Sequence, residues 1–173
     1  MKYSILLNKS TVLGQIPVLY KEEIEFFICG NLDNFNHTII LTDKFHHEIG
    51  RLYLDSSHFL SSYSIDVINH PLVKIKKLNS SFTNLFYITK LKYWVKGSIK
   101  KGNYSFYKGT TELANVRTLI TNDGNTLSCN IQNTATVPFI LLSAMLFTQW
   151  HVTPLRLPYF SLFSEKNMLF SRN

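Results

Sequence analysis

Cysteine is scarce in this chain of 173 residues, which contains only Cys29 and Cys129. Two isolated cysteines do not make a disulfide framework or a zinc site. Both stand in apolar, strand-like surroundings, so we expect buried, reduced side chains in a reducing compartment, with a single disulfide as the open alternative. The N-terminal stretch MKYSILLNKS also lacks the long hydrophobic region and the small-residue cleavage site of a signal peptide, which favours a cytoplasmic location.

The sequence also lacks a hydrophobic run long enough to cross a bilayer. Its most apolar stretch is VPFILLSAMLFTQW at residues 137–150, and a membrane-spanning helix needs roughly 20 predominantly apolar residues. We therefore expect no transmembrane span. The stretch is apolar around its whole circumference, so a soluble helix of this kind must be surrounded by protein. Thr134, Thr136 and Pro138 suit the start of this helix.

Sequence motifs of catalysis and metal binding are missing as well. No glycine-rich dinucleotide motif, P-loop or nucleophile elbow is present. The stretch FHHEI joins His46, His47 and Glu48, but neighbouring residues on a strand point to opposite faces, and the histidines show no zinc-ligand spacing. The sequence thus predicts no catalytic residue, no metal site and no cofactor. An enzyme whose site is assembled from aspartates and histidines in turns stays open.

Acidic residues are fewer than basic ones, with 11 Asp and Glu against 18 Lys and Arg and a formal net charge of +7. This balance favours anionic partners such as phosphate-bearing lipids or nucleic acid. Net charge alone does not identify a partner, so an inert basic surface is an equally open interpretation.

Alternation with period two dominates the chain before residue 136. Short alternating stretches separated by clusters of Asn, Asp and Gly, as in TNDGNT, predict strands. The predicted strands cover residues 24–30, 37–43, 49–55, 63–69, 72–78, 85–91, 93–99, 103–109, 113–121 and 126–132. Many short strands at close spacing indicate a sandwich or a barrel.

An ungapped internal repeat relates YSIDVINHPLVKIKKL at residues 63–78 to YSFYKGTTELANVRTL at residues 104–119. Both copies begin with Tyr-Ser and end in a strand that alternates apolar and basic residues. We predict two hairpins that superpose, with Tyr63 and Tyr104 in equivalent places. The competing explanation is that any two amphipathic hairpins look somewhat alike.

Two related hairpin units can belong to one closed sheet, and closure removes exposed strand edges. A barrel with enough strands leaves a lumen that must be filled, and residues 137–150 are the plausible filler. We therefore predict a mainly β fold, a closed antiparallel β-barrel around a buried hydrophobic C-terminal helix. The predicted domain covers residues 1–151, with the helix at 137–150 and a C-terminal extension at 152–173.

This architecture and its motifs resemble the LURP-one-related family of the tubby C-terminal-like superfamily. The resemblance runs from Ile39 to Trp150 and is carried by TDKFHHEIGRLYLDSSHFLSSYSIDVINHPLVKIKKL, by LKYWVKGSIKKGNYSFYKGTTELANVRTL and by the late hydrophobic helix. It implies a closed barrel wrapped around that helix. It also implies a role at membrane surfaces, because tubby-like relatives include phosphoinositide binders and the similar phospholipid scramblases. The segment after the helix departs from the family, whose domains usually end there.

Basic residues are unevenly distributed and gather in the second half of the predicted strands. Alternation places Lys74 and Lys76 on one strand face, and Lys90, Lys92 and Lys96 on another if that strand continues. The interleaved aromatic residues are Tyr93, Trp94, Tyr104 and Tyr107. We select as the candidate ligand-binding face, with ammonium groups that project outward, Lys74, Lys76, Lys92 and Lys96. A solvated outer barrel face is the competing interpretation, since alternating lysines also protect exposed strands.

Three hypotheses of function follow from this surface. The first is a non-catalytic binding or scaffold domain that associates peripherally with an anionic membrane surface or a phosphate ligand, with a protein partner as a further option. The second is a nucleic-acid-binding barrel that uses the same lysine and aromatic surface. The third is an enzyme, which a plugged barrel disfavours because it leaves little room for a pocket with convergent polar groups.

Overall fold

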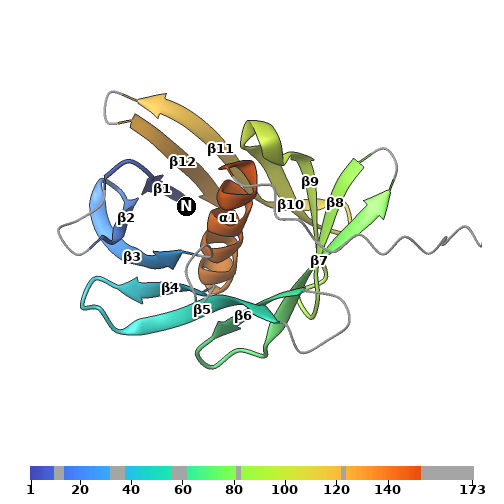
Figure 1. The fold of residues 1–173 in the computed structure, drawn as a ribbon, viewed down its shortest axis with the longest axis horizontal. Helices are drawn as coiled ribbons and strands as arrows, with labels where there is room; N and C mark the ends of the chain where they lie inside the picture. The colour runs from blue at the N-terminus through green and yellow to red at the C-terminus, as the bar shows by residue number, and fades with distance from the viewer. Residues whose placement is uncertain (10–13, 32–37, 56–61, 81–82, 122–123, 153–173) are drawn as a thin grey trace, which may run out of the picture.

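The computed structural model of the chain describes residues 1–9, 14–31, 38–55, 62–80, 83–121 and 124–152. In these residues twelve antiparallel strands form one closed barrel around an α-helix (Figure 1). Each strand pairs with its neighbours in the chain, and β1 pairs with β12, so the ring is complete. The predicted fold class is confirmed. The extension predicted for residues 152–173 lies outside the described residues, except for Val152 at the helix end.

Every strand that alternation predicted is present, and β1 and β2 were not predicted. Five residues give each of these two strands too few alternations to stand out. The strands are β1 (Lys2–Leu6), β2 (Ile16–Tyr20), β3 (Glu23–Asn31), β4 (Thr38–Asp43), β5 (Glu48–Asp55), β6 (Ser62–Val67), β7 (Val73–Ser80), β8 (Thr83–Ile88), β9 (Tyr93–Ser98), β10 (Asn103–Lys108), β11 (Thr111–Thr121) and β12 (Gly124–Ile131). A short 3₁₀ helix, η1 (Ile99–Lys101), joins β9 to β10.

Strand β1 closes the barrel. Tyr3 on β1 pairs with Cys129 on one side and with Tyr20 on the other. The amino group of Met1 donates to the carbonyl oxygen of Ile131 at 2.7 Å, and the Ile131 N–H donates to the Met1 carbonyl at 2.7 Å. Because these partners are 130 residues apart, a local sequence pattern does not reveal the closure.

Helix α1 (Val137–Val152) begins after a 3₁₀ turn, η2 (Thr134–Thr136). The capping residue is Asn133, whose side-chain oxygen accepts the Ala135 N–H at 3.0 Å. The Thr136 hydroxyl donates to the Asn133 carbonyl at 2.8 Å. The predicted helix is thus confirmed, but its start is set by Asn133 and not by the threonines alone, because the extra 3₁₀ turn moves the cap upstream.

Helix α1 fills the lumen of the barrel. Every residue from Phe139 to Phe147 is buried, in agreement with the all-round apolar pattern. The Phe147 ring lies near those of Phe86, Tyr104 and Phe106, at centroid distances of 4.9, 5.3 and 6.4 Å. The inward strand positions that complete this core include Ile5, Val18, Ile28, Leu41, Leu52, Ile65, Ile75, Val95, Val116 and Leu127. In the described residues no helix has the length and apolarity that crossing a membrane requires.

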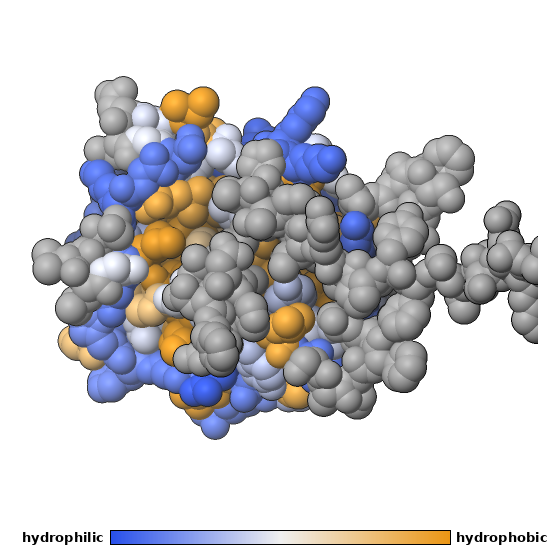
Figure 2. Space-filling view, in the orientation of Figure 1, coloured by the Kyte–Doolittle hydropathy of each residue, from blue (hydrophilic) through white to orange (hydrophobic). Residues whose placement is uncertain are grey.

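The inner surface of the barrel is apolar, and the edge that surrounds it in this view is hydrophilic. Figure 2 shows apolar residues gathered in the left half of the view, inside a hydrophilic rim. This is where Figure 1 places the inner side of β1 to β3 next to α1. Alternation along the strands therefore separates an inner surface that contacts the helix from an outer surface that faces solvent.

The repeated hairpins have the same pairing register. The first is β6 with β7 and the second is β10 with β11, and the predicted equivalence of Tyr63 and Tyr104 is confirmed because each points into the core and has a corresponding partner. The matching pairs are Tyr63–Ile75 with Tyr104–Val116, Ser64–Lys74 with Ser105–Asn115, and Ile65–Val73 with Phe106–Ala114. The copies diverge after Phe106, where the register shifts. They lie four strands apart in a ring of twelve, so two copies alone do not generate the barrel.

One end of the barrel carries the connections that follow β2, β4, β6, β8 and β10, and we call it the turn end. It is the end at which α1 begins, and it consists of residues 21–22, 44–47, 68–72, 89–92 and 109–110. In the described part of the chain, all non-glycine residues with positive φ lie in these turns: Lys21, Glu22, His46, Asn69, Lys90 and Lys92. Residues other than glycine are disfavoured in this left-handed backbone conformation, so these turns store backbone strain.

We predict that replacing Leu142 by Asp abolishes soluble, folded protein. The Leu142 side chain is 0% exposed inside the barrel, and an unpaired buried charge costs several kcal/mol. Soluble yield and circular dichroism measure the effect. Ile120→Asp is the matched control, because Ile120 is 89% exposed and should tolerate the charge. A folded Leu142→Asp variant with the parent's melting temperature would contradict the central position of the helix.

We predict that Glu22→Gly raises stability by about 1 kcal/mol, because Glu22 has φ 70° in a two-residue hairpin turn that favours glycine. Thermal unfolding should show a midpoint higher by about 2–4 °C. Glu23→Gly is the neighbouring control. Glu23 lies in strand β3 without positive φ, so glycine there should lower the midpoint. Equal effects of the two substitutions would refute the assignment of strain to Glu22.

Candidate binding surfaces

The four lysines selected from the sequence do not form one face. Lys74 and Lys76 on β7 and Lys96 on β9 alternate with buried residues and so point outward. Lys92 lies in the turn between β8 and β9 with φ 58°, and Lys90 has φ 62°. The prediction that Lys90, Lys92 and Lys96 share a strand face is therefore wrong, because left-handed backbone interrupts the strand after Ile88.

Lys74 is engaged in an ion pair on the outer wall. Its ammonium group lies 2.7 Å from a carboxylate oxygen of Asp55, and the two side chains are only 27% and 15% exposed. The Ser64 hydroxyl approaches the same oxygen at 3.5 Å and is fully buried. The charge of Lys74 is thus compensated by Asp55. This lysine contributes to the wall of the barrel and is poorly placed to bind an external anion.

Two of the four aromatic residues named from the sequence are core residues. Tyr93 and Tyr104 point into the barrel and are 6% and 3% exposed. Burial raises the pKa of both phenols, for Tyr104 well above its usual value of 10.0. Trp94 and Tyr107 point outward and are half-buried. An aromatic residue reaches solvent if it lies on the strand face that points away from the helix. The alternation in the sequence does not specify which of the two faces that is.

Trp94 and Tyr107 belong to a row of outward side chains across adjacent strands, which we call the wall row. In register, it runs through Lys76, Tyr87, Trp94 and Tyr107. The rings of Tyr87 and Trp94 lie 4.7 Å apart with an interplanar angle of 45°. The Lys96 ammonium group lies 5.5 Å from the Tyr107 ring centroid. Sequence reasoning missed Tyr87, because only strand register brings it beside Trp94.

The row ends at a carboxylate. Tyr107 pairs with Glu112 on β11, and the Tyr107 hydroxyl donates to the Glu112 carboxylate at 3.3 Å. In the described part of the chain, neither Lys76 nor Lys96 has a carboxylate within ion-pair distance. The wall row and the adjacent Lys96 therefore combine three half-buried aromatic rings with two uncompensated ammonium groups, and the negative charge of Glu112 lies at one end.

A second surface lies at the turn end, on the three adjacent turns 44–47, 68–72 and 89–92. Its apolar members are Phe45, Ile68 and Leu72, which are 67%, 57% and 42% exposed. The turns are neighbours, because the Ile68 N–H donates to the Ile49 carbonyl at 3.0 Å and the Thr89 N–H donates to the Lys74 carbonyl at 2.9 Å. Three exposed lysines occupy the same turns: Lys44, Lys90 and Lys92.

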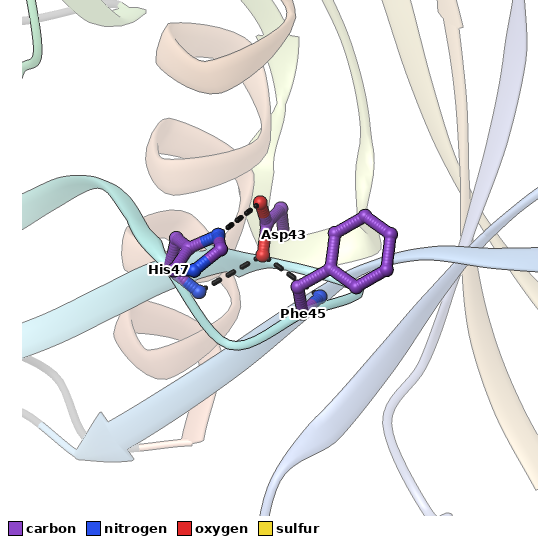
Figure 3. A network of polar contacts seen from close by, with 3 residues as sticks. All are labelled: Asp43, Phe45 and His47. Atoms are coloured by element: carbon purple, nitrogen blue, oxygen red, sulfur yellow. Dashed lines mark hydrogen bonds and ion pairs between the residues drawn. The ribbon is translucent and has the colours of Figure 1, made fainter.

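A network around Asp43 holds the first of these turns in place (Figure 3). One carboxylate oxygen of Asp43 accepts the backbone N–H groups of Phe45 and His47 at 2.8 and 2.9 Å. The other lies 3.2 Å from Nδ1 of His47. Figure 3 shows the Phe45 ring directed away from this network. The backbone is thus fixed by Asp43 while the phenyl ring is left to solvent.

The His46 and cysteine side chains show no convergence on a reactive site. His46 stacks on Phe27 at a centroid distance of 5.1 Å, whereas His47 contacts Asp43. Both histidines lie in the turn between β4 and β5, so the prediction that they stand on a strand is wrong. Both cysteines are free. Cys129 is buried and its pKa is raised to about 12 by burial, whereas Cys29 is half-buried on the outer side of β3, so the expectation of burial is wrong for Cys29. Among the described residues no three His, Cys, Asp or Glu side chains are grouped as metal ligands.

The chain was compared with known proteins and structures. Neither a family model nor a curated protein matches it. Its fold is similar to that of an X-ray structure of a protein from Arabidopsis thaliana, with a TM-score of 0.58 and 13% sequence identity. The similarity covers 86% of this chain and 89% of the Arabidopsis chain. At this identity the likeness concerns the fold alone.

We predict that the Asp43 carboxyl titrates below its usual pKa of 3.8. Desolvation raises its pKa, but hydrogen bonds from His47 and Phe45 outweigh that effect and lower it. Because the folded pKa is depressed, the stabilisation is present above the unfolded pKa of about 3.9 and is lost as the pH falls through the folded value. The difference in melting temperature between the parent and Asp43→Asn should therefore shrink below about pH 4. An NMR titration that places the Asp43 pKa above 3.8 would contradict this network.

Proposed function

We propose that the protein is a non-catalytic binding domain that attaches peripherally to anionic membrane surfaces through its turn end. The observation that carries the proposal is the exposure of Phe45, Ile68 and Leu72 beside uncompensated lysines on three adjacent turns. An apolar side chain that enters the headgroup region gains the free energy of burial. A lysine near an anionic leaflet adds about 1 kcal/mol. The two contributions act at the same place and in the same direction.

This assignment changes the set of lysines that we place in the binding site. Lys92 belongs to the turn end and is retained, and Lys44 and Lys90 of the same turns are added. Lys74 is omitted because it pairs with Asp55 at 2.7 Å. Lys76 and Lys96 are omitted because they project from strands β7 and β9 and not from the turns.

We propose in addition that the chain is a member of the LURP-one-related group of tubby C-terminal-like proteins. A closed barrel around a buried C-terminal helix supports this membership, and the Arabidopsis structure is similar in fold. A cytoplasmic location at the membrane surface is part of the same proposal. Membrane attachment is also the role that the relatives of this family suggest.

Flotation with vesicles tests the attachment. The parent protein should float with vesicles of phosphatidylcholine and phosphatidylserine at low salt and remain free with phosphatidylcholine alone. High salt should weaken binding, because it screens exposed charges. Lys90→Gln/Lys92→Gln should lower the affinity about tenfold or more, from two lysines at about 1 kcal/mol each. Phe45→Ser should lower it by a similar factor through lost apolar burial.

The opposite end of the barrel supplies matched controls. Lys100→Gln/Lys101→Gln removes the same charge from η1, and Ile120→Ser removes an exposed apolar side chain that is 89% exposed. Both control variants should float like the parent. Absence of binding to anionic vesicles at low salt would refute the proposal. Equal losses in the control and turn-end variants would show a non-specific effect of net charge and would refute the assigned surface.

A further inference from the structure

The wall row differs from the turn end in composition and geometry. Its aromatic residues Tyr87, Trp94 and Tyr107 do not protrude from turns but lie half-buried on three adjacent strands. Neighbouring strands are about 4.8 Å apart, so three strands span roughly 10 Å. We call these three rings on the outer wall of the barrel the platform. The exposed side chains of the turn end are better suited to a bilayer surface than these half-buried rings are.

Cations border the platform. Lys76 lies at its β7 side, and Lys96 holds its ammonium group 5.5 Å from the Tyr107 ring centroid. Arg117 on β11 is exposed and lies opposite Asn103, which is four residues from Tyr107 along β10. In the described part of the chain, these three cations have no ion-pair partner. A polyanion that crosses the strands would therefore find positive charge beside the rings.

Hydrogen-bonding groups lie between the platform and Arg117. Lys96 pairs with Ser105, which pairs with Asn115, and the Asn115 amide donates to the Ser105 hydroxyl at 2.9 Å. The surface thus offers rings, then polar groups and then a guanidinium group over three neighbouring strands. A single-stranded nucleic acid carries flat bases along a phosphate backbone. Aromatic rings can stack on the bases, and neighbouring cations can bind the phosphates, so this surface suits such a ligand.

We propose that the wall row binds single-stranded nucleic acid, with bases against Tyr87, Trp94 and Tyr107 and phosphates near Lys76, Lys96 and Arg117. A duplex keeps its bases stacked inside, where wall-row rings do not reach them, so the ligand is single-stranded. The rings of Tyr87 and Trp94 are tilted by 45° and do not stack face to face on each other, which leaves ring surface for a base. Glu112 repels phosphate and limits the site on the β11 side.

Fluorescence anisotropy with labelled oligothymidine and oligouridine of roughly 12 nucleotides tests the proposal, with a duplex of the same length for comparison. The parent should bind both single strands and bind the duplex more weakly. Trp94→Leu should weaken binding about fivefold to a hundredfold, in line with the loss of one stacked base. Lys76→Gln/Lys96→Gln should reduce the slope of log affinity against log salt by about 1.4, for two single-strand phosphate contacts. Glu112→Gln should strengthen binding.

Controls separate this site from the turn end and from bulk charge. Tyr53 is a half-buried outward aromatic residue on β5, away from the wall row, so Tyr53→Leu should bind like the parent. Lys21→Gln/Lys44→Gln removes the same charge from two turns of the turn end that do not adjoin the wall-row strands, and it should keep the parent's salt slope. Melting temperatures establish that each variant is folded. Tyr87→Leu provides a second test of stacking if Trp94→Leu is unstable.

Several outcomes would overturn the proposal. These are no binding of single strands at about 50 mM salt, equal binding of the duplex, or equal losses in the wall and turn-end double variants. Loss of vesicle flotation in Trp94→Leu without any single-strand binding would assign the row to a membrane instead. The vesicle proposal depends on the turn-end variants and this proposal on the wall variants, so failure of either leaves the other intact.

Discussion

A twelve-stranded barrel encloses a lumen too wide for its own inward side chains to fill, and α1 occupies that space. Phe147 meets Phe86, Tyr104 and Phe106 across the lumen, and the helix is buried from Phe139 to Phe147. Each strand must therefore direct its apolar face toward the helix. This constraint depends in turn on closure by β1, because an open sheet would not hold a helix that is apolar on all sides.

Filling the lumen with a helix leaves the exterior as the place for binding. The two candidate surfaces arise in different ways. At the turn end, short connections force side chains such as Phe45, Lys90 and Lys92 into solvent, and Asp43 fixes one of the turns. On the wall, strand register aligns Tyr87, Trp94 and Tyr107. The first surface consists of exposed side chains on turns and the second of half-buried rings on strands, and that difference is the reason for assigning them different ligands.

The internal repeat illustrates how one hairpin geometry serves two environments. Ser64 and Ser105 occupy equivalent outward positions, opposite Lys74 and Asn115 respectively. In the first copy Lys74 binds Asp55, which ties β7 to β5 across β6. In the second copy the Asn115 amide binds Ser105, and the neighbouring Lys96 is free to lie near Tyr107. The same backbone register thus places a compensated charge in the first copy and a neutral amide in the second, beside the uncompensated Lys96 of β9.

Local patterns were sufficient to predict the strands from residue 24 onward, the buried helix and the equivalence of the two hairpins, because period-two alternation and all-round apolarity involve residues close together in the chain. Four other features follow from three-dimensional packing. They are the closure of the ring by β1, the ion pair of Lys74, the burial of Tyr93 and Tyr104, and the contact of Tyr87 with Trp94. Alternation shows that neighbouring residues face opposite ways. It does not show which way is inward, where left-handed residues such as Lys92 end a strand, or which residues of separate strands become neighbours. Those choices follow from packing against α1 and from strand register, which involve residues far apart in the chain.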